Sequence, residues 1–407
     1  MNAAIHPLPY ANRRARPGEA PEVRDFLARA EKAAKVAERF ADQVDREARF
    51  PHEAFQAIRE QKLLGMLIPT TLGGENARTS DCADVCAILG AACGSTGMIF
   101  AMHQVKVACL IRHDRENGWL KAFLRDAVSE QYLLASSTTE GNRGADIRSS
   151  DAAIKLDRAR VRLDRDASCI SYGAQADAIV TVARRADAAS SSDQVLVVFR
   201  RSDYTLEPTR SWDTLGMRGT CSSGYLLRAE GHADQVLGEP YERIHNQSMV
   251  PHAHILWSST WQGVASAAYR RARAFVRQAS RTSGGKMPPG VQHLTQARMH
   301  LETLRNAIQG GLATFDRHAQ EPGGLTSMNA QLSLNFLKVN ASELATQTVM
   351  EAMRAGGLSA YRNDSEFAMG RFLRDILSSP IMIHNDRVLA NSEAAVLMSE
   401  PPLHVAF

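Results

Sequence analysis

The chain has 407 residues, of which 44% are hydrophobic and 23% charged, and its formal net charge is +4. This composition excludes a disordered chain, a collagen and a small disulfide-rich scaffold. The positive charges are scattered, so the sequence predicts no nucleic-acid-binding surface. No apolar run reaches the roughly 18 residues that a membrane-spanning helix needs. The six cysteines form neither a CxxC pair nor metal-ligand spacing. We therefore expect a cytoplasmic protein with reduced thiols and neither metal site nor membrane span.

The first part of the chain reads as a leader followed by helices. Residues 1–22 are rich in Pro and Arg, which predicts a flexible leader. From 23 to 130 the apolar residues recur at helical spacing, for example Phe26, Ala30, Ala33 and Ala37. This spacing predicts an N-terminal helical domain, with later helices at about 51–65, at 80–113 with a break near Gly94, and at 117–129.

The character of the sequence changes near residue 131. A Gly- and Ser-rich segment at 133–150 has no helical period and predicts a loop. Short alternating or β-branched runs bounded by Ser, Asp and Gly then predict strands. These runs lie near 154–156 and 161–163, at 177–183 and at 194–199. We expect a central β domain at 131–242.

Helical periodicity returns in the last part of the chain, which we expect to form a helical bundle at 243–407. Leu294, Leu301, Ile308 and Phe315 lie on one predicted helix face. Further helices are predicted at 328–353, up to a break at 355–361, and then at 364–377 and 385–398. Because helices and strands are segregated along the chain, the expected fold class is α+β.

Five sequence motifs resemble those of the acyl-CoA dehydrogenase superfamily and occur along the chain in the family's order. The resemblance extends from about residue 25 to 395. The first, TTEGNRGAD at 138–146, is similar to the family's T-E-P-G-A-G-S-D loop. The resemblance implies an N-terminal helical domain, a central β domain and a C-terminal four-helix bundle. It also implies bound FAD, with the hydroxyl of Thr139 and nearby main chain on the flavin ring. Gly144 would permit close backbone approach to the ligand, and Ala145 stands where the family has a Ser.

Further motifs extend this cofactor assignment. Ser171 in CISYG takes the place of the Thr in the family's W-I-T-N-G, which hydrogen-bonds flavin N5. Arg281 and Gln292 match the family's R…Q spacing, in which the Arg reaches the FAD pyrophosphate across a subunit boundary. Gly356 and Gly357 resemble the turn that passes under the FAD adenosine. A homo-oligomer, either dimer or tetramer, is therefore expected.

The segment WDTLGMRGT at 212–220 resembles the family segment along the substrate channel, which implies substrate contacts from Arg218 and Thr220. The family's catalytic Glu, however, has no counterpart. Its usual position, nine residues after the Arg of an R-D pair, falls on Ile383, and an alternative position falls near Ala253.

Two histidines and an aspartate are the candidates for the missing catalytic group. His384 and Asp386 follow the expected base position, and either one would remove the α proton. Flavin monooxygenases of this fold also lack the Glu and tend to carry a His in this loop. They often carry a second His on a helix facing the flavin, where this chain has His103. A neutral imidazole is suited to proton transfer near pH 7.

We favour FAD-dependent α,β-dehydrogenation of an acyl thioester, on CoA or a carrier protein, with hydride transfer to flavin N5. An electron-transfer flavoprotein is then the expected redox partner. The alternative is a two-component monooxygenase that activates oxygen at flavin C4a. It would use reduced flavin, FMN or FAD, from a flavin reductase, and an aromatic substrate. A third hypothesis is a non-catalytic flavin-binding protein.

Overall fold

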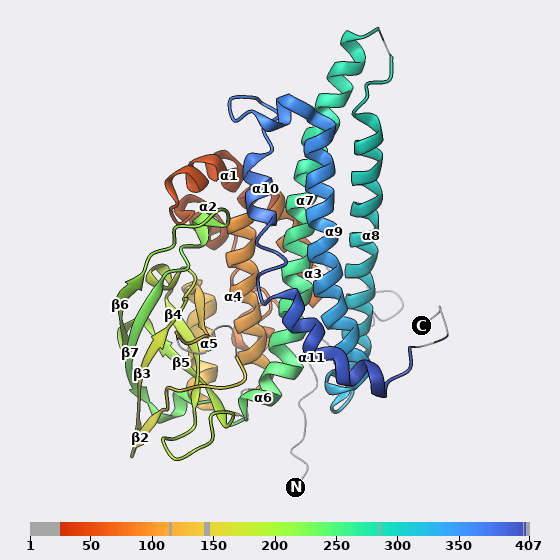
Figure 1. Cartoon of the computed structure of the whole chain (residues 1–407). Coiled ribbons are helices and arrows are strands. Elements are labelled where there is room, and N and C mark those ends of the chain that lie inside the picture. Colours follow the sequence, from red (N-terminus) through yellow and green to blue (C-terminus); the bar gives the residue numbers. More distant parts are fainter. Residues whose placement is uncertain (1–24, 114–115, 142–146, 285, 402, 404–407) are drawn as a thin grey trace, which may run out of the picture.

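The computed structural model describes residues 25–113, 116–141, 147–284, 286–401 and 403. Helices come first, strands follow, and long helices end the chain (Figure 1). This order confirms the expected α+β class. The predicted leader lies outside the described residues. None of the described helices is both long and apolar enough to cross a membrane.

The N-terminal helices pack on one another and against the long helix α7. Their buried positions recur at helical spacing, as at Ala30, Ala33 and Ala37 of the first helix. These helices are α1 (Phe26–Glu47), α2 (His52–Glu60), α3 (Thr79–Ala92), α4 (Gly94–Arg112) and α5 (Gly118–Ser129). The helix α4 is buried along most of its length, which places it in the middle of the molecule.

The β domain contains two sheets. The first has strand order β1-β4-β5, with β1 parallel to β4, and the second is antiparallel with order β2-β3-β7-β6. The strands are β1 (Leu134–Ser137), β2 (Lys155–Asp157), β3 (Arg160–Ala167), β4 (Ala178–Arg184), β5 (Gln194–Arg200), β6 (Tyr204–Arg210) and β7 (Gly224–His232). The loop prediction at 133–150 is wrong at its start, because Leu134 to Ser137 pair with β4.

The C-terminal bundle is built on α7, which packs against α3, α8 and α9 around the fully buried Trp261. Its elements are α6 (Tyr241–Ile244), α7 (Val250–Thr282), α8 (Val291–His318), α9 (Met328–Tyr361), α10 (Gly370–Ile376) and α11 (Asn385–Met398). The predicted break at 355–361 is wrong in extent. The helix continues to Tyr361 and is interrupted only at Gly357, which has φ of 53°.

Candidate functional site

Hydroxyl groups gather at the end of the β domain that faces the helices. The Ser222 hydroxyl lies 2.8 Å from the hydroxyls of both Ser171 and Thr220, and Thr220 also donates to the Met217 carbonyl at 2.8 Å. Tyr172, buried with φ of 44°, turns the chain beside them and donates to the Leu134 carbonyl. The structure thus brings the predicted residues Ser171 and Thr220 into one hydrogen-bonded cluster.

The Thr-Glu-Gly motif begins beside this cluster. The Thr139 hydroxyl accepts a 2.7 Å hydrogen bond from Ser168. Glu140 is buried, pairs with Arg165 at 3.0 Å and accepts the amide of Ala152 at 3.1 Å. The carboxylate of this motif therefore anchors the segment. Gly144 and Ala145, predicted to contact flavin, lie outside the described residues.

The segment at 212–220 is a junction between domains. The Arg218 guanidinium donates to the carbonyls of Asp45 at 2.8 Å and Thr214 at 3.1 Å. Asp375 accepts the Met217 amide at 2.7 Å, and burial raises the pKa of its carboxyl to about 6. The Arg218 guanidinium thus joins the β domain to α1, and its predicted substrate contact stays a prediction.

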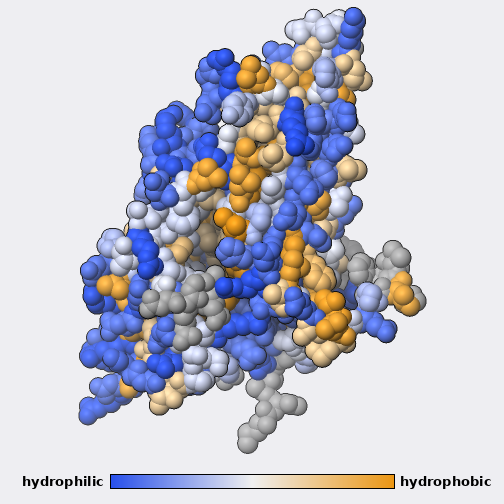
Figure 2. All heavy atoms as spheres, viewed as in Figure 1, coloured by the Kyte–Doolittle hydropathy of each residue, from blue (hydrophilic) through white to orange (hydrophobic). Residues whose placement is uncertain are grey.

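A cavity of about 360 Å³ lies between the β domain and the bundle. The surface is hollowed in this region (Figure 2). Residues from the segment before β2 and from α7, α9 and α11 line it: Ile147, Arg148, His245, Val250, His254, Asn335, Ile383, Arg387, Val388 and Asn391. A second cavity of about 550 Å³ shares Arg148, His245, Asn335 and Asn391 with it. The two cavities therefore adjoin.

His254 projects from the second turn of α7 into the smaller cavity. Its Nδ1 lies 3.0 Å from the Leu334 carbonyl oxygen. Because a carbonyl only accepts hydrogen bonds, Nδ1 must carry the proton, and Nε2 presents a lone pair. Burial lowers the pKa of His254 to about 3, and the positive charge of Lys338 acts in the same direction. The imidazole is therefore neutral at physiological pH, with Nε2 as a hydrogen-bond acceptor.

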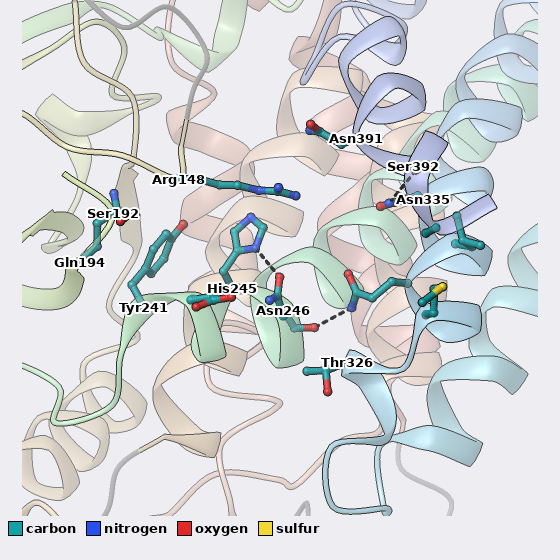
Figure 3. A pocket seen from close by; sticks show the side chains of 15 residues that line it. Arg148, Ser192, Gln194, Tyr241, His245, Asn246, Thr326, Asn335, Asn391 and Ser392 are labelled. Carbon is teal, nitrogen blue, oxygen red and sulfur yellow. Dashed lines mark hydrogen bonds between the residues drawn. The ribbon is translucent and has the colours of Figure 1, made fainter. Parts of the chain in front are cut away.

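His245 lines both cavities and begins a π-helical turn, His245–Met249. Arg148 extends above its ring, and Asn246 bonds its Nδ1 at 2.9 Å (Figure 3). In an uninterrupted α-helix, residues nine apart differ by about 900° and face opposite sides. The wider π turn reduces this rotation, so His245 and His254 can face the same space.

Lys338 of α9 hydrogen-bonds to the loop around Ile383, the position at which the family carries its catalytic Glu. Its ammonium donates to the Ile383 carbonyl at 3.1 Å and to Asn385 Oδ1 at 2.7 Å. Burial lowers the pKa of Lys338 to about 8. Ile383 has φ of 50° and lines the cavity. The loop is thus fixed in position by a buried cation.

The catalytic candidates predicted in this loop lie elsewhere. His384 and Asp386 are exposed at the start of α11, and neither is among the residues that line the two cavities. The backbone turns at Ile383, so the side chain of Ile383, rather than that of His384, lines the cavity. This arrangement argues against a catalytic role for His384 and Asp386.

His103 is a core residue of α4 with an exposed fraction of 1%. Its Nε2 lies 2.9 Å from the Leu64 carbonyl, and its Nδ1 accepts the Leu134 amide at 3.0 Å. Burial lowers its pKa to about 4. Both ring nitrogens are bonded to the main chain, so the predicted proton-transfer role would require one of these bonds to break, and it stays a prediction. His103 instead connects α4 to the first strand of the β domain.

The predicted pyrophosphate and adenosine contacts lie apart from this cavity. Arg281 and Gln292 are exposed on either side of the α7–α8 turn, which projects at the end of the bundle away from the β domain (Figure 1). Gly356 is buried and Gly357 exposed, near the C-terminal end of α9. Within one chain, these residues and the hydroxyl cluster are not brought together.

Sequence reasoning missed His245, His254 and Lys338. One signal was available for His254, which directly follows Ala253, the alternative base position of the family. The other two had no comparable signal. The π turn that orients His245 has no sequence signature, and Lys338 reads as one polar residue of an amphipathic helix.

Two family models match the chain and together cover more than half of it. They are "Acyl-CoA dehydrogenase, N-terminal domain", over residues 20–126, and "Acyl-CoA dehydrogenase, C-terminal domain", over residues 247–396. Among curated proteins, glutaryl-CoA dehydrogenase of Desulfococcus multivorans is 25% identical, over 83% of this chain and 86% of that protein. Isovaleryl-CoA dehydrogenase of Pongo abelii is 22% identical, over 82% and 78%.

Solved structures share the fold. FMN-bound TdsC from Paenibacillus sp. A11-2 superposes with a TM-score of 0.80 at 19% identity, covering 93% of this chain and 98% of that one. TdsC is described as a dibenzothiophene monooxygenase. Because identities this low support only the fold, the family assignment depends on the matched models and the curated relatives. On that basis, the chain belongs to the acyl-CoA dehydrogenase family.

Proposed function

We propose that the protein is a flavin-dependent oxidoreductase that dehydrogenates an acyl thioester, with His254 as the catalytic base. One observation carries this proposal, namely that the Nε2 lone pair of His254 faces the cavity. None of the described residues lining the 360 Å³ cavity carries a carboxyl group. We therefore assign to this neutral imidazole the role that the family gives to a Glu.

The described residues fit a flavin at the β-domain end of the cavity region. The Thr139 hydroxyl is bonded to that of Ser168, and the Ser171 hydroxyl to that of Ser222. Because a hydroxyl both donates and accepts, each can also turn toward a polar ligand. We propose that Thr139 and Ser171 hold the flavin ring. A bound flavin would supply the hydride acceptor.

The remaining chemistry belongs to His254. Its Nδ1–H stays on the Leu334 carbonyl while Nε2 takes the α proton, so the ring need not rotate. The carbonyl can then stabilise the imidazolium that forms. The low pKa of His254 makes it a weak base in the empty cavity. Negative charge on the bound substrate would raise that pKa and strengthen the base.

A second candidate, the two-component monooxygenase, is favoured by the TdsC fold similarity and by the carboxyl-free lining of the smaller cavity. Oxygen chemistry needs a proton donor, however, and the His254 tautomer offers an acceptor. His245 would have to supply the proton. For this reason we rank dehydrogenation first.

We further propose that the active form is a homo-oligomer. Arg281 and Gln292 lie too far along the bundle to meet the hydroxyl cluster of their own chain (Figure 1). Exposed apolar side chains gather over α9, α10 and α11 (Figure 2), including Leu358, Leu377, Ile381, Leu389 and Leu397. Arg281→Ala should lower both flavin content and oligomer mass in sedimentation. Unchanged values for both would reject the shared site.

The function is tested by anaerobic titration of flavin-loaded protein with a series of acyl thioesters. Dehydrogenation predicts bleaching of the flavin absorbance and an enoyl product. If no thioester bleaches the flavin, but reduced flavin and oxygen convert an aromatic substrate, the monooxygenase is correct. A dehydrogenase would pass its electrons to an electron-transfer flavoprotein, whereas a monooxygenase would depend on a flavin reductase. A protein inactive in both assays is a non-catalytic flavin-binding protein.

A further inference from the structure

The smaller cavity has a positive electrostatic character. Arg148 and Arg387 line it, and the Lys338 ammonium lies directly beneath its Ile383 wall. No carboxyl group belongs to its described lining. The positive charges of Arg148 and Lys338 also help to keep His245 and His254 unprotonated. Cavities lined by one sign of charge concentrate ligands of the opposite sign.

Arg387, in the first turn of α11, has a guanidinium nitrogen that lacks a partner. Its Nη1 is buried and makes no hydrogen bond within the described part of the chain. No ion pair links Arg387 to a described carboxylate, whereas Arg374 of α10 is paired with Asp45. A buried donor left unsatisfied costs about 1–3 kcal/mol. An acceptor supplied by a ligand would remove this cost.

The neighbouring side chains suit an anionic ligand. Asn391 lies one turn after Arg387 on α11, Asn335 lies on α9, and both amides line the larger cavity as well. In the close view, Arg148 reaches across His245 toward these two amides (Figure 3). Guanidinium and amide N–H groups are the donors that proteins use to bind carboxylate and phosphate.

We infer that the cavity binds substrates carrying an anionic group, and that Arg387 pairs with that group. This inference rests on the proposed function and specifies its substrate class. The anion is either a carboxylate at the far end of the acyl chain or a phosphate of the thioester carrier. In both cases its charge offsets the field of Arg387 and Lys338, which favours protonation of His254 during catalysis.

Equilibrium binding tests this without turnover when the bound flavin is kept reduced, because reduced flavin cannot accept a hydride. Glutaryl-CoA and valeryl-CoA have acyl chains of equal length, one ending in a carboxylate and the other in a methyl group. Free glutarate and glutaryl-pantetheine complete the set. Dissociation constants are measured by calorimetry for the wild type and for Arg387→Gln and Arg387→Lys. Arg362→Gln is the matched control, because Arg362 is exposed and paired with Asp364 away from the cavity.

We expect Arg387→Gln to weaken glutaryl-CoA and glutarate about 10- to 100-fold, as for a lost charge-assisted bond. Valeryl-CoA should be unaffected, and Arg387→Lys should recover part of the loss. If both CoA esters weaken equally and glutaryl-pantetheine does not, the recognised anion is the carrier phosphate.

Unchanged affinities for every ligand in Arg387→Gln would overturn the inference, even if thioesters bleach the flavin. Conversely, Arg387-dependent binding of glutarate without any bleaching by thioesters would support it and reject the proposed function. Circular dichroism of each variant shows separately whether it is folded.

Discussion

The helices α4 and α7 both carry a buried histidine into the middle of the molecule, but they use it differently. His103 of α4 has a main-chain partner on each ring nitrogen. His254 of α7 has one partner, and its other nitrogen faces a cavity. Burial lowers the pKa of both, to about 4 and about 3. The lowered pKa therefore does not distinguish the two histidines, whereas the number of hydrogen-bond partners of each ring does.

The difference follows from what each helix faces. His103 lies between the α2–α3 connection and β1, where two main-chain groups need partners away from water. The first turns of α7 instead border the space between the β domain and α11. A sequence shows the residue type in both places, whereas the unused lone pair is visible only in the fold.

The largest expected effect concerns His254→Asn. The Asn amide nitrogen is as many bonds from Cα as Nδ1, so it can keep the bond to Leu334, but nothing replaces Nε2. We expect anaerobic flavin reduction to slow about 10²- to 10⁴-fold, with flavin content unchanged. The wild-type rate should rise with pH through the pKa that His254 has with substrate bound, which lies above the value of about 3 in the free protein because the substrate's negative charge raises it.

Stopped-flow absorbance measures this rate. His384→Ala is the matched control, since that imidazole is exposed and outside both cavities. A His384→Ala variant that fails while His254→Asn reduces flavin normally would return the base to the loop after α10 and refute the comparison.

The next effect is on stability. His103→Ala leaves the Leu134 amide without its partner, removes one of the two donors to the Leu64 carbonyl and opens a cavity, which should lower the unfolding free energy by about 2–5 kcal/mol. His254→Ala removes one such bond at a site open to the cavity and should cost less. Urea denaturation followed by circular dichroism compares the two. Equal losses would mean that partner number does not set the roles of these histidines.

Lowering the pH should reduce the stability of the fold through these and other buried histidines. His103, His245 and His252 have pKa values lowered by burial to about 4, and that of His254 is about 3. Their unfolded values are about 6.5. Above pH 6.5 they are neutral in both states, so stability is constant. Below it the unfolded chain binds protons that the fold excludes, so stability falls.

The slope is about 1.4 kcal/mol per pH unit for each histidine. Asp375 acts oppositely between its unfolded value and about 6, because its pKa is raised. Urea midpoints at pH 7.5, 6 and 5 measure the net change in unfolding free energy. His103→Gln should reduce its dependence on pH by the contribution of one histidine. A stability that stays constant down to pH 5 would contradict the buried neutral state of these rings.

The smallest effect is expected in the β domain. Ser171→Ala removes one hydroxyl of the cluster with Ser222 and Thr220 and should weaken flavin binding about fivefold, the value of roughly one net hydrogen bond. Fluorescence titration with FAD and FMN measures the affinity. Ser202→Ala, at an exposed hydroxyl beside β6, is the control. An unchanged affinity in both variants would remove Ser171 from the flavin site.

The fold was predictable to a large extent, because helical and alternating periods reflect burial directly. The α1 pattern of Phe26, Ala30, Ala33 and Ala37 is buried as expected. β1 was missed because it has only four residues, two of which are Ser, and because its pairing with β4 is a long-range contact. The extent of α9 was missed because Gly357 has a non-helical backbone inside a continuing helix.

The candidate site was predictable only in part. Ser171 and Thr220 were found through motifs, and the fold places them in one cluster. His103 and Arg218 also lie in motifs, but their side chains are used by the main chain. Motif matching identifies which positions matter to the fold, and it does not separate groups that act on a ligand from groups that hold two domains together.

The Lys338 ammonium next to the loop at Ile383 affects whether a carboxylate base could be introduced at residue 383. Ile383→Glu would restore a carboxylate at the inherited position and relieve a β-branched residue of its left-handed backbone. The new carboxylate would lie on the loop whose Ile383 carbonyl accepts a hydrogen bond from the Lys338 ammonium. An ion pair there would hold the Glu ionised but lower its basicity. A working carboxylate base at residue 383 would therefore require a second change at Lys338, so the two positions have to be changed together.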